Sequence, residues 1–300
     1  MDLLSNMALF VEVVRTRSFQ RAALNLQMPI STLSRRISDF EKRLGMKLLH
    51  RTTRKVEPTA EGMHYYSRCA PLVDEAKLAH EDLLSIRDGV RGPLRVSCSP
   101  DFAALHLLPM LDRFLQEHPQ LELQLDLTVR RVDLLAESFD AALRLGRLDD
   151  STLVARPIAD FPAGLFVSPD FVRLHGLPRE PQDLAQWPCL RMGTTPPFSR
   201  WTLVNDLQPR QPQVVAVQGR LVANSMQMLA HLCCCGHGIA LIDLKAAAAA
   251  EHKGDLIRVL PQWQGLGTTL HLVTASRLVP ARVRAFGDAL VDYFSSELTS

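Results

Sequence analysis

The sequence predicts an α+β multidomain protein with a small basic head, a long connecting helix and a large α/β body. In the head, apolar residues repeat at helical spacing and a basic segment with apolar flanks follows. A seven-residue apolar repeat then runs through the connecting segment, and residues 94–300 alternate between strand-like and helix-like stretches. With 300 residues, the chain is long enough for two domains of ~100–200 residues each.

Charge is distributed unevenly along the chain. The formal net charge is +2, yet residues 1–65 carry a net +5 and residues 66–300 a net −3. A basic head on a mildly acidic body indicates that one end alone meets a polyanion. No stretch approaches the ~18–20 uncharged apolar residues of a membrane helix, and no signal peptide is evident. We therefore expect a cytoplasmic protein without membrane contact.

The head is expected to contain a helix-turn-helix. Leu3–Val14 is amphipathic, Ser18 can cap a second helix, and Pro29 suits the opening position of a third over Ile30–Leu44, which Gly45 can end. Polar side chains near the start of the third helix lie off its apolar stripe, where a recognition helix meets base edges and phosphates. These candidate DNA-binding residues are Ser31, Thr32, Ser34, Arg35 and Arg36.

A basic turn flanked by apolar residues follows the third helix and predicts a two-stranded wing. Its cations would contact the DNA backbone, supplying affinity with little sequence information. Any single basic cluster is more often an ordinary solvated surface. The order of helices, basic helix and basic hairpin nevertheless favours a DNA-binding winged helix-turn-helix over residues 1–59. The candidate wing residues are Arg51, Thr52, Thr53, Arg54 and Lys55.

Residues 60–88 are expected to form a linker helix that pairs with a second copy. Apolar residues there step by 4 and 3, which is the spacing of a coiled-coil seam. Pairing is favoured over packing on the chain's own body, because a symmetric pair places two heads on a two-fold site. Pro71 should kink the helix or weaken one turn, and residues 89–93 are expected to be a hinge. The seam consists of Tyr65, Cys69, Leu72, Ala76, Ala79, Leu83 and Ile86.

Alternating patterns in the body predict α/β sheets with helices on both faces. Strands are expected at 94–98, 121–129, 140–145, 164–168, 214–217, 239–242 and 269–274. Helices are expected at 102–117, 132–138, 169–175, 225–235, 244–252 and 280–296.

Several ordered motifs resemble the LysR-type transcriptional regulators. They run over residues 19–26, 31–37, 40–49, 51–54 and 59–62. The resemblance implies that the body is a two-lobed α/β effector domain of periplasmic-binding-protein type, with lobe I at about 94–163 and 265–300 and lobe II at about 164–264. Crossovers are expected near Pro162–Gly164 and Gln264–Gly267. The resemblance also implies double-stranded promoter DNA, a small-molecule effector in the cleft, a homodimer or homotetramer, and RNA polymerase as a further candidate partner.

The candidate effector site lies where strands end. Open α/β sheets bind ligands beyond the carboxyl ends of their strands, and the amides of a following helix suit an anionic or polar group. Each candidate residue could instead serve only in capping or turns. Asp101 would repel an anion unless it points away, and it could instead favour a cationic or hydroxylated ligand. The candidates are Ser99, Pro100, Asp101 and Phe102, and, by position in the family pattern, Val129, Gly146, Thr194, Phe198, Asn224, Ser225 and Asp243.

Other classes of function find less support in the sequence. No GxSxG, HExxH, P-loop or GxGxxG motif occurs, so we expect no enzyme, no metal and no cofactor. The cysteines at 69, 98, 189, 233, 234 and 235 form no CxxC pair and suit small buried hydrophobes. The alternative is a thiol-based redox-responsive regulator, which would need an exposed thiol with a lowered pKa.

Overall fold

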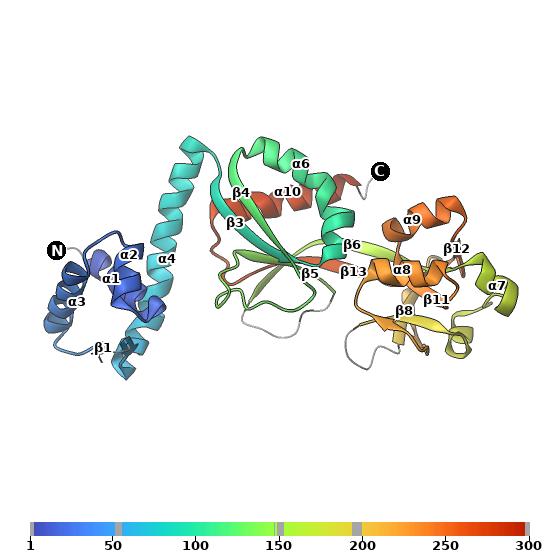
Figure 1. Cartoon of the computed structure of the whole chain (residues 1–300), viewed down its shortest axis with the longest axis horizontal. Coiled ribbons are helices and arrows are strands. Elements are labelled where there is room, and N and C mark those ends of the chain that lie inside the picture. Colours follow the sequence, from blue (N-terminus) through green and yellow to red (C-terminus); the bar gives the residue numbers. More distant parts are fainter. Residues whose placement is uncertain (1–2, 52–55, 147, 149–152, 194–199, 298–300) are drawn as a thin grey trace. The chain divides into compact units, whose positions relative to one another are not determined.

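The computed structural model describes residues 3–51, 56–146, 148, 153–193 and 200–297 (Figure 1). The chain divides into two compact units, Met1–Asp88 and Gly89–Ser300. None of the helices in the described part is long and apolar enough to cross a membrane.

The first unit contains the expected head. Its helices are α1 (Leu3–Thr16), α2 (Phe19–Asn25) and α3 (Ile30–Leu44), and Ser18 caps α2 by accepting a hydrogen bond from the Arg21 amide. Pro29 is the N-cap of α3, one position earlier than expected. The helices enclose a core whose fully or nearly buried side chains are Phe10, Val13, Ala22, Ala23, Leu33, Ile37, Phe40 and Leu48.

A short antiparallel hairpin follows α3, as the sequence predicts. Gly45 ends α3 with φ +69°, a left-handed conformation that glycine adopts without steric penalty. Strand β1 (Leu49–Arg51) then pairs with β2 (Val56–Pro58). The head therefore has the order of elements of a winged helix-turn-helix.

Helix α4 (Ala60–Asp88) runs through Pro71 without interruption in its helical assignment. The expected seam does not form a single exposed face. Cys69 packs with Val73 against α1 of the same unit, whereas Leu72 and Leu83 are 52% and 65% exposed. The start of the seam is thus part of the chain's own core, whereas Ala76, Ala79 and Leu83 are exposed.

The expected hinge is shorter in the structure. Strand β3 (Arg91–Cys98) begins inside residues 89–93 and pairs in parallel with β4 (Gln120–Leu127) along its whole length. Residues 91–93 are therefore paired strand, and only residues 89 and 90 separate α4 from β3.

Lobe I of the second unit is built on β4, β3 and β5 (Ala141–Leu145). Between β3 and β4 the chain is helical from Pro100 to Glu117, as α5 (Pro100–Phe102), a π-helix (Ala103–Leu107) and α6 (Leu108–Glu117). It packs with α10 (Ala281–Glu297) over buried side chains that include Leu107, Phe114, Phe286, Leu290 and Phe294.

The helix expected over residues 132–138 is wrong, because this segment is an irregular turn. The Asp133 carboxylate accepts hydrogen bonds from the amides of Leu135 and Ala136, and the Glu137 carboxylate accepts one from the Asp133 amide. Side chains therefore bind amides near the start of the segment, an arrangement that competes with continued helix.

Lobe II contains a second group of strands covered by helices. The sequence did not predict the strands at Cys189–Met192, Arg200–Asn205, Val222–Ala223 and Ile257–Arg258, or most of the strand at Gln208–Ala216. The strands are β7 (Cys189–Met192), β8 (Arg200–Asn205), β9 (Gln208–Ala216), β10 (Val222–Ala223), β11 (Ile239–Asp243) and β12 (Ile257–Arg258). The helices are α7 (Pro169–His175), a 3-10 helix (Pro181–Gln186), α8 (Met226–Cys234) and α9 (Leu244–Lys253).

Two long antiparallel strands join the lobes (Figure 1). Strand β6 (Val154–Val167) is much longer than the expected 164–168, and it pairs with β13 (Trp263–Thr274). The start of β13 pairs with β8 of lobe II and its later part with β5 of lobe I. The β6–β13 register shifts between Gly265 and Thr268, next to the expected crossover.

Candidate DNA-binding surface and effector cleft

Helix α3 presents one buried and one solvated side. Leu33, Ile37 and Phe40 are buried in the head, whereas Ser31 and Arg35 are exposed. Thr32 and Ser34 are partly exposed. This is the division that a recognition helix requires, because its reading side must be free to enter a groove.

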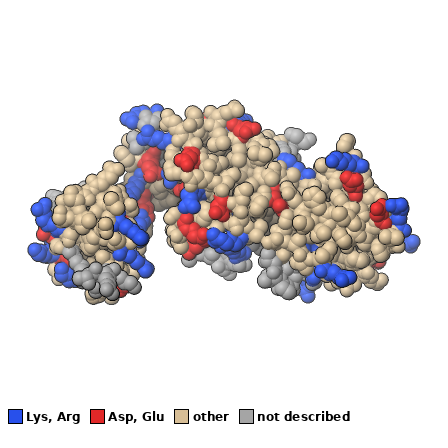
Figure 2. All heavy atoms as spheres, viewed as in Figure 1, with Lys and Arg blue, Asp and Glu red and all other residues tan. Residues whose placement is uncertain are grey.

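Arg36 differs from the other candidates on α3. Its Nη2 donates a 3.2 Å hydrogen bond to Oδ1 of Asn6, which is buried in α1. This contact links α3 to α1, so Arg36 has a packing role in the head. Figure 2 shows Lys and Arg side chains on the visible face of the head unit.

The wing candidates lie mostly outside the described residues. Arg51 ends β1, but its side chain is not described, and Thr52, Thr53, Arg54 and Lys55 lie outside the described part of the chain. What the structure does describe is the base of the wing.

Glu41, which the sequence reasoning missed, joins α3 to the base of the wing. Its Oε1 accepts hydrogen bonds from the amides of Leu48 and Leu49 at 2.9 and 3.1 Å, and its Oε2 lies 3.1 Å from Nζ of Lys47. Burial by itself would raise the pKa of Glu41, but these hydrogen bonds and the Lys47 charge bring it below its usual value. A buried carboxylate thus fixes where the chain leaves α3.

Thr59 makes a second connection at the same place. Its amide donates to the Leu48 carbonyl, its hydroxyl donates to the Lys47 carbonyl, and the hydroxyl oxygen accepts from the Gly62 amide at 2.9 Å. Thr59 therefore caps α4 and also binds the base of the wing. Gly62 lies so close to this turn that an added Cβ would fall 1.9 Å from the Leu48 carbonyl oxygen.

In the second unit, a cavity of about 330 Å³ lies between the lobes. This volume is at the lower end of the ~300–1,000 Å³ typical of small-molecule sites. Of the expected effector residues, Ser99, Asp101, Phe102, Val129, Asn224 and Asp243 line it. Pro100, Gly146 and Ser225 do not line it, and Thr194 and Phe198 lie outside the described residues. The other lining residues were not anticipated and include Leu105, His106, Thr128, Arg144, Phe161, Met192, Met226 and Thr268.

Helix caps account for several of the expected residues. Ser99 accepts from the Phe102 amide, Ser225 from the Met228 amide at 3.1 Å, and Asp243 from the Ala246 amide at 3.0 Å. Ser99 and Asp243 thus cap helices and also line the cavity.

Asp101 does not act on its own helix. Its carboxylate accepts hydrogen bonds from the Ser225 hydroxyl and from the amides of Met226 and Gln227, at the start of α8 in lobe II. The positive end of α8 is therefore already occupied by a carboxylate of the chain itself.

Arg144 supplies a cation to the cavity from β5. Its guanidinium donates to the carbonyl and hydroxyl of Ser97, to the Leu143 carbonyl and to the Arg130 carbonyl. All four of these acceptors are neutral oxygens. Nothing in the sequence distinguishes Arg144 from a surface arginine, because strand alternation alone does not show which face borders the cavity.

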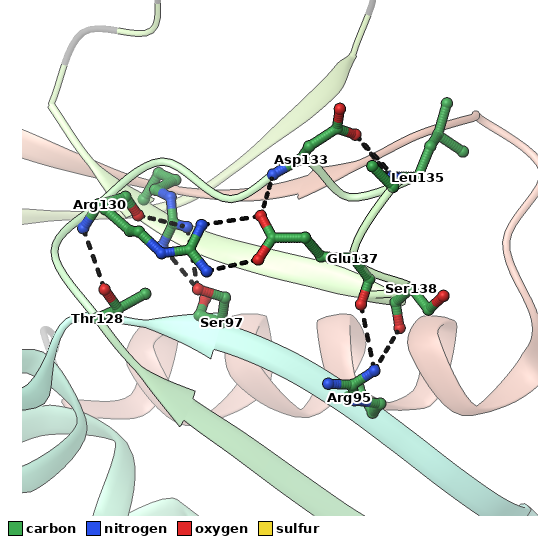
Figure 3. Close-up of polar contacts among 10 residues, drawn as sticks. Arg95, Ser97, Thr128, Arg130, Asp133, Leu135, Glu137 and Ser138 are labelled. Carbon is green, nitrogen blue, oxygen red and sulfur yellow. Dashed lines mark hydrogen bonds and ion pairs between the residues drawn. The ribbon is translucent and has the colours of Figure 1, made fainter.

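The loop beside Thr128 and Val129 is held by the polar contacts in Figure 3. Arg130 pairs with Glu137 through both carboxylate oxygens, and this contact lowers the pKa of Glu137 to about 2. Arg95 of β3 donates to the Glu137 and Ser138 carbonyls at 3.2 and 3.3 Å. The loop that contributes to the cavity wall is therefore attached to the sheet of lobe I.

The cysteines give the redox alternative little support. Burial raises the pKa of the Cys98 thiol to about 11 and that of Cys189 and Cys233 to about 12, and it also raises the pKa of Cys69 and Cys234. Such thiols are largely protonated at neutral pH and react slowly. Cys235 alone is exposed among the cysteines.

Comparison with known proteins identifies both units. Residues 4–63 match the bacterial regulatory helix-turn-helix protein, lysR family, and residues 87–295 match the LysR substrate binding domain. The chain is 30% identical over 299 residues to the HTH-type transcriptional activator AaeR of Escherichia coli strain K12, covering 98% of this chain and 94% of the relative. It is 31% identical over 277 residues to an uncharacterized HTH-type transcriptional regulator of Haemophilus influenzae, covering 92% and 95%.

Solved structures agree with this assignment. The chain resembles CrgA, a LysR-type transcriptional regulator from Neisseria meningitidis, with a TM-score of 0.60 and 30% identity over 97% of this chain and 98% of that one. It also resembles the Vibrio cholerae virulence activator AphB, with a TM-score of 0.55 and 26% identity over 98% and 100% of the two chains. These proteins are transcriptional regulators and not enzymes, and this chain belongs to the LysR family of transcriptional regulators.

Proposed function

We propose that this LysR-type regulator reads promoter DNA with α3, contacts its backbone with the wing, and responds to a small molecule bound between the lobes. The observation that carries the proposal is a cavity lined by both lobes in a chain that also bears a helix-turn-helix with a solvated reading side. LysR-type regulators bind DNA and effectors as oligomers. We place this one in the cytoplasm, as a homodimer or homotetramer that acts on RNA polymerase at its promoters.

Arg35 is the sharpest test of the DNA-binding part. It is exposed on α3, and an arginine at a base edge contributes about 1–3 kcal/mol, a loss of roughly 5- to 150-fold in affinity. The operator is first obtained by sequencing the DNA that the purified protein retains. Arg35→Ala should then weaken binding and relax base preference at one position of each half-site.

Lys42→Ala is the matched control, because Lys42 lies in the last turn of the same helix and carries the same charge. It should change affinity much less than Arg35→Ala and leave base preference intact. Equal footprints and affinities for wild type and Arg35→Ala would refute the assignment of the reading side.

Val129 tests the effector part. It lines the cavity and its side chain is 51% exposed, so a larger side chain can enter the cavity without disturbing a packed core. A small-molecule library is screened for compounds that shift DNA binding, and Val129→Trp should abolish the response to any compound found. Leu127→Trp is the control, since Leu127 is similarly exposed at 50% and does not line the cavity. A compound that acts equally on both variants would place its site elsewhere.

A further inference from the structure

Two side chains from one helical stretch of lobe I contact lobe II. Asp101 lies in α5 and His106 in the π-helix that follows it. Asp101 binds Ser225, Met226 and Gln227, which lie more than 120 positions further along the chain. His106 contacts Asp243. Both therefore connect segments that belong to different lobes.

The contact of Asp101 is made to the first turn of α8. The Ser225 hydroxyl donates to Oδ1 at 3.2 Å, and the amides of Met226 and Gln227 donate to Oδ2. Amides in the first turn of a helix have no partner within the helix, and a nearby anion is favoured by the helix dipole. A charge-assisted contact of this kind is among the stronger hydrogen bonds of a protein.

The contact of His106 is made to the residue that caps α9. Its Nε2 lies 3.3 Å from Oδ1 of Asp243, the residue that caps α9. The imidazole is 6% exposed, with the ring of Phe161 at 4.4 Å and that of Phe102 stacked at 5.4 Å, both from lobe I. Its Nδ1 is buried without a partner among the described residues. The ring is thus held by lobe I and directed at lobe II.

The π-helix explains how both side chains reach the same side. Asp101 and His106 are five residues apart, which on an α-helix of 3.6 residues per turn separates them by about 140°. A π turn forms i→i+5 hydrogen bonds, here from the Leu108 amide to the Ala103 carbonyl. Side chains five residues apart therefore lie nearer to the same side of the helix than they would on an α-helix. Such insertions are frequent at functional sites.

We propose that Asp101 and His106 form an interlobe latch, in which each residue holds the N-terminal end of a different lobe II helix and the pair sets the population of the open cleft. The proposal rests on the proposed function, since it assigns a regulatory role to the walls of the effector cavity. Asp101, His106, Met226 and Asp243 all line that cavity, so a molecule entering it lies against both arms of the latch.

The strands that connect the lobes determine how the cleft between them can open. Chain continuity between the lobes runs through β6 and β13, whose register shifts between Gly265 and Thr268 and again between Leu270 and His271. Rotation about this pair would separate α8 and α9 from the stretch that leads into α6 (Figure 1). Opening by rotation therefore requires both latch contacts to break.

The test measures the distance between the lobes in the full chain, without DNA or effector. Spin labels are attached at Leu115→Cys on α6 and Leu174→Cys on α7, both exposed, in a background in which Cys234 and Cys235 are replaced by serine. Loss of one charge-assisted hydrogen bond corresponds to about a tenfold change in a two-state equilibrium. Asp101→Ala removes three such bonds and should therefore increase the population at long distances by at least about tenfold.

Asp112→Ala is the matched control, because Asp112 is an exposed carboxylate on the same helical stretch. It should reproduce the wild-type distribution. Asp101→Asn is the second variant, which keeps the side chain's size and one acceptor and should give an intermediate distribution. It keeps the test informative if Asp101→Ala does not fold.

The failures of the two proposals are distinguishable. A folded Asp101 variant whose distance distribution equals that of the wild type and of Asp112→Ala overturns the latch, whatever the protein does with DNA. A protein that retains no DNA overturns the proposed function, and leaves the distance measurement unaffected.

Discussion

Glu41 offers a quantitative test of how α3 and the wing are joined. In Glu41→Ala, the buried amides of Leu48 and Leu49 lose their acceptor. An unsatisfied buried amide costs about 1–3 kcal/mol, so with two such amides the head should lose about 2–6 kcal/mol of unfolding free energy. Glu41→Gln keeps one oxygen for these amides and loses the pairing with Lys47, whose side chain is 72% exposed. An exposed ion pair contributes about 0–1 kcal/mol, and a neutral amide oxygen is a weaker acceptor than a carboxylate. Glu41→Gln should therefore lower the unfolding free energy of the head by about 1–2 kcal/mol.

The same residue predicts a pH dependence. Because the folded-state pKa of Glu41 lies below its ordinary value near 4.5, the carboxylate contributes stability that is present above that value. The contribution is lost as the pH falls through the lowered folded-state pKa. The difference in unfolding free energy between wild type and Glu41→Gln should therefore shrink on acidification from about pH 7 towards pH 4 and below.

The measurement is urea-induced unfolding of the full chain, followed by a spectroscopic signal from the helical head. Glu57→Gln is the control, because Glu57 is an exposed carboxylate on β2 of the same wing. If Glu41→Gln and Glu57→Gln unfold at the same urea concentration at neutral pH, the buried carboxylate does not stabilise the wing and the reasoning fails.

Three further predictions concern other parts of the chain. Gly62→Ala should destabilise the head by about 1–3 kcal/mol in thermal unfolding, because its Cβ would clash with the Leu48 carbonyl oxygen. Leu83→Glu should lower the oligomer mass in light scattering, because this exposed seam residue would bring a charge into the proposed pair of linker helices. A thiol-alkylating reagent at neutral pH should modify exposed Cys235 well before Cys98, whose pKa is about 11.

Each of these predictions has an internal comparison. Met63→Ala, next to Gly62 and half exposed, should leave the melting temperature almost unchanged. Leu24→Glu, an equally exposed leucine on α2, should leave the oligomer mass unchanged. Rapid alkylation of Cys98 or Cys233 in the folded chain would contradict the burial that raises their pKa values.

Elements with local signals were predictable. The bounds of α3 and α7 agree with the sequence, because each has its cap, its apolar spacing and its terminating residue within a few positions. The cap at Ser225 likewise follows from neighbouring residues, and the structure shows it. Local hydrogen bonds and helical periodicity depend on residues three or four apart, so they can be inferred from sequence alone.

Elements decided by distant partners were missed or misassigned. Strand β8 is defined by pairing with β9 and β13, and β6 extends over both lobes because β13 lies beside it. The expected seam on α4 is not continuous, because Cys69 packs against α1 of its own unit. In each case the apolar pattern shows that a side chain will be buried, but it does not identify the element that covers it.

The sequence by itself determined the order of elements in the helix-turn-helix and the bounds of α3 and α7, since all of these depend on near neighbours. Only the tertiary structure decided that Asp101 binds the first turn of α8 and that His106 meets Asp243. The physical reason is that these contacts join residues more than 120 positions apart. The residues are brought together by the pairing of β6 with β13, which run between the lobes, and the local sequence of one strand does not identify its partner.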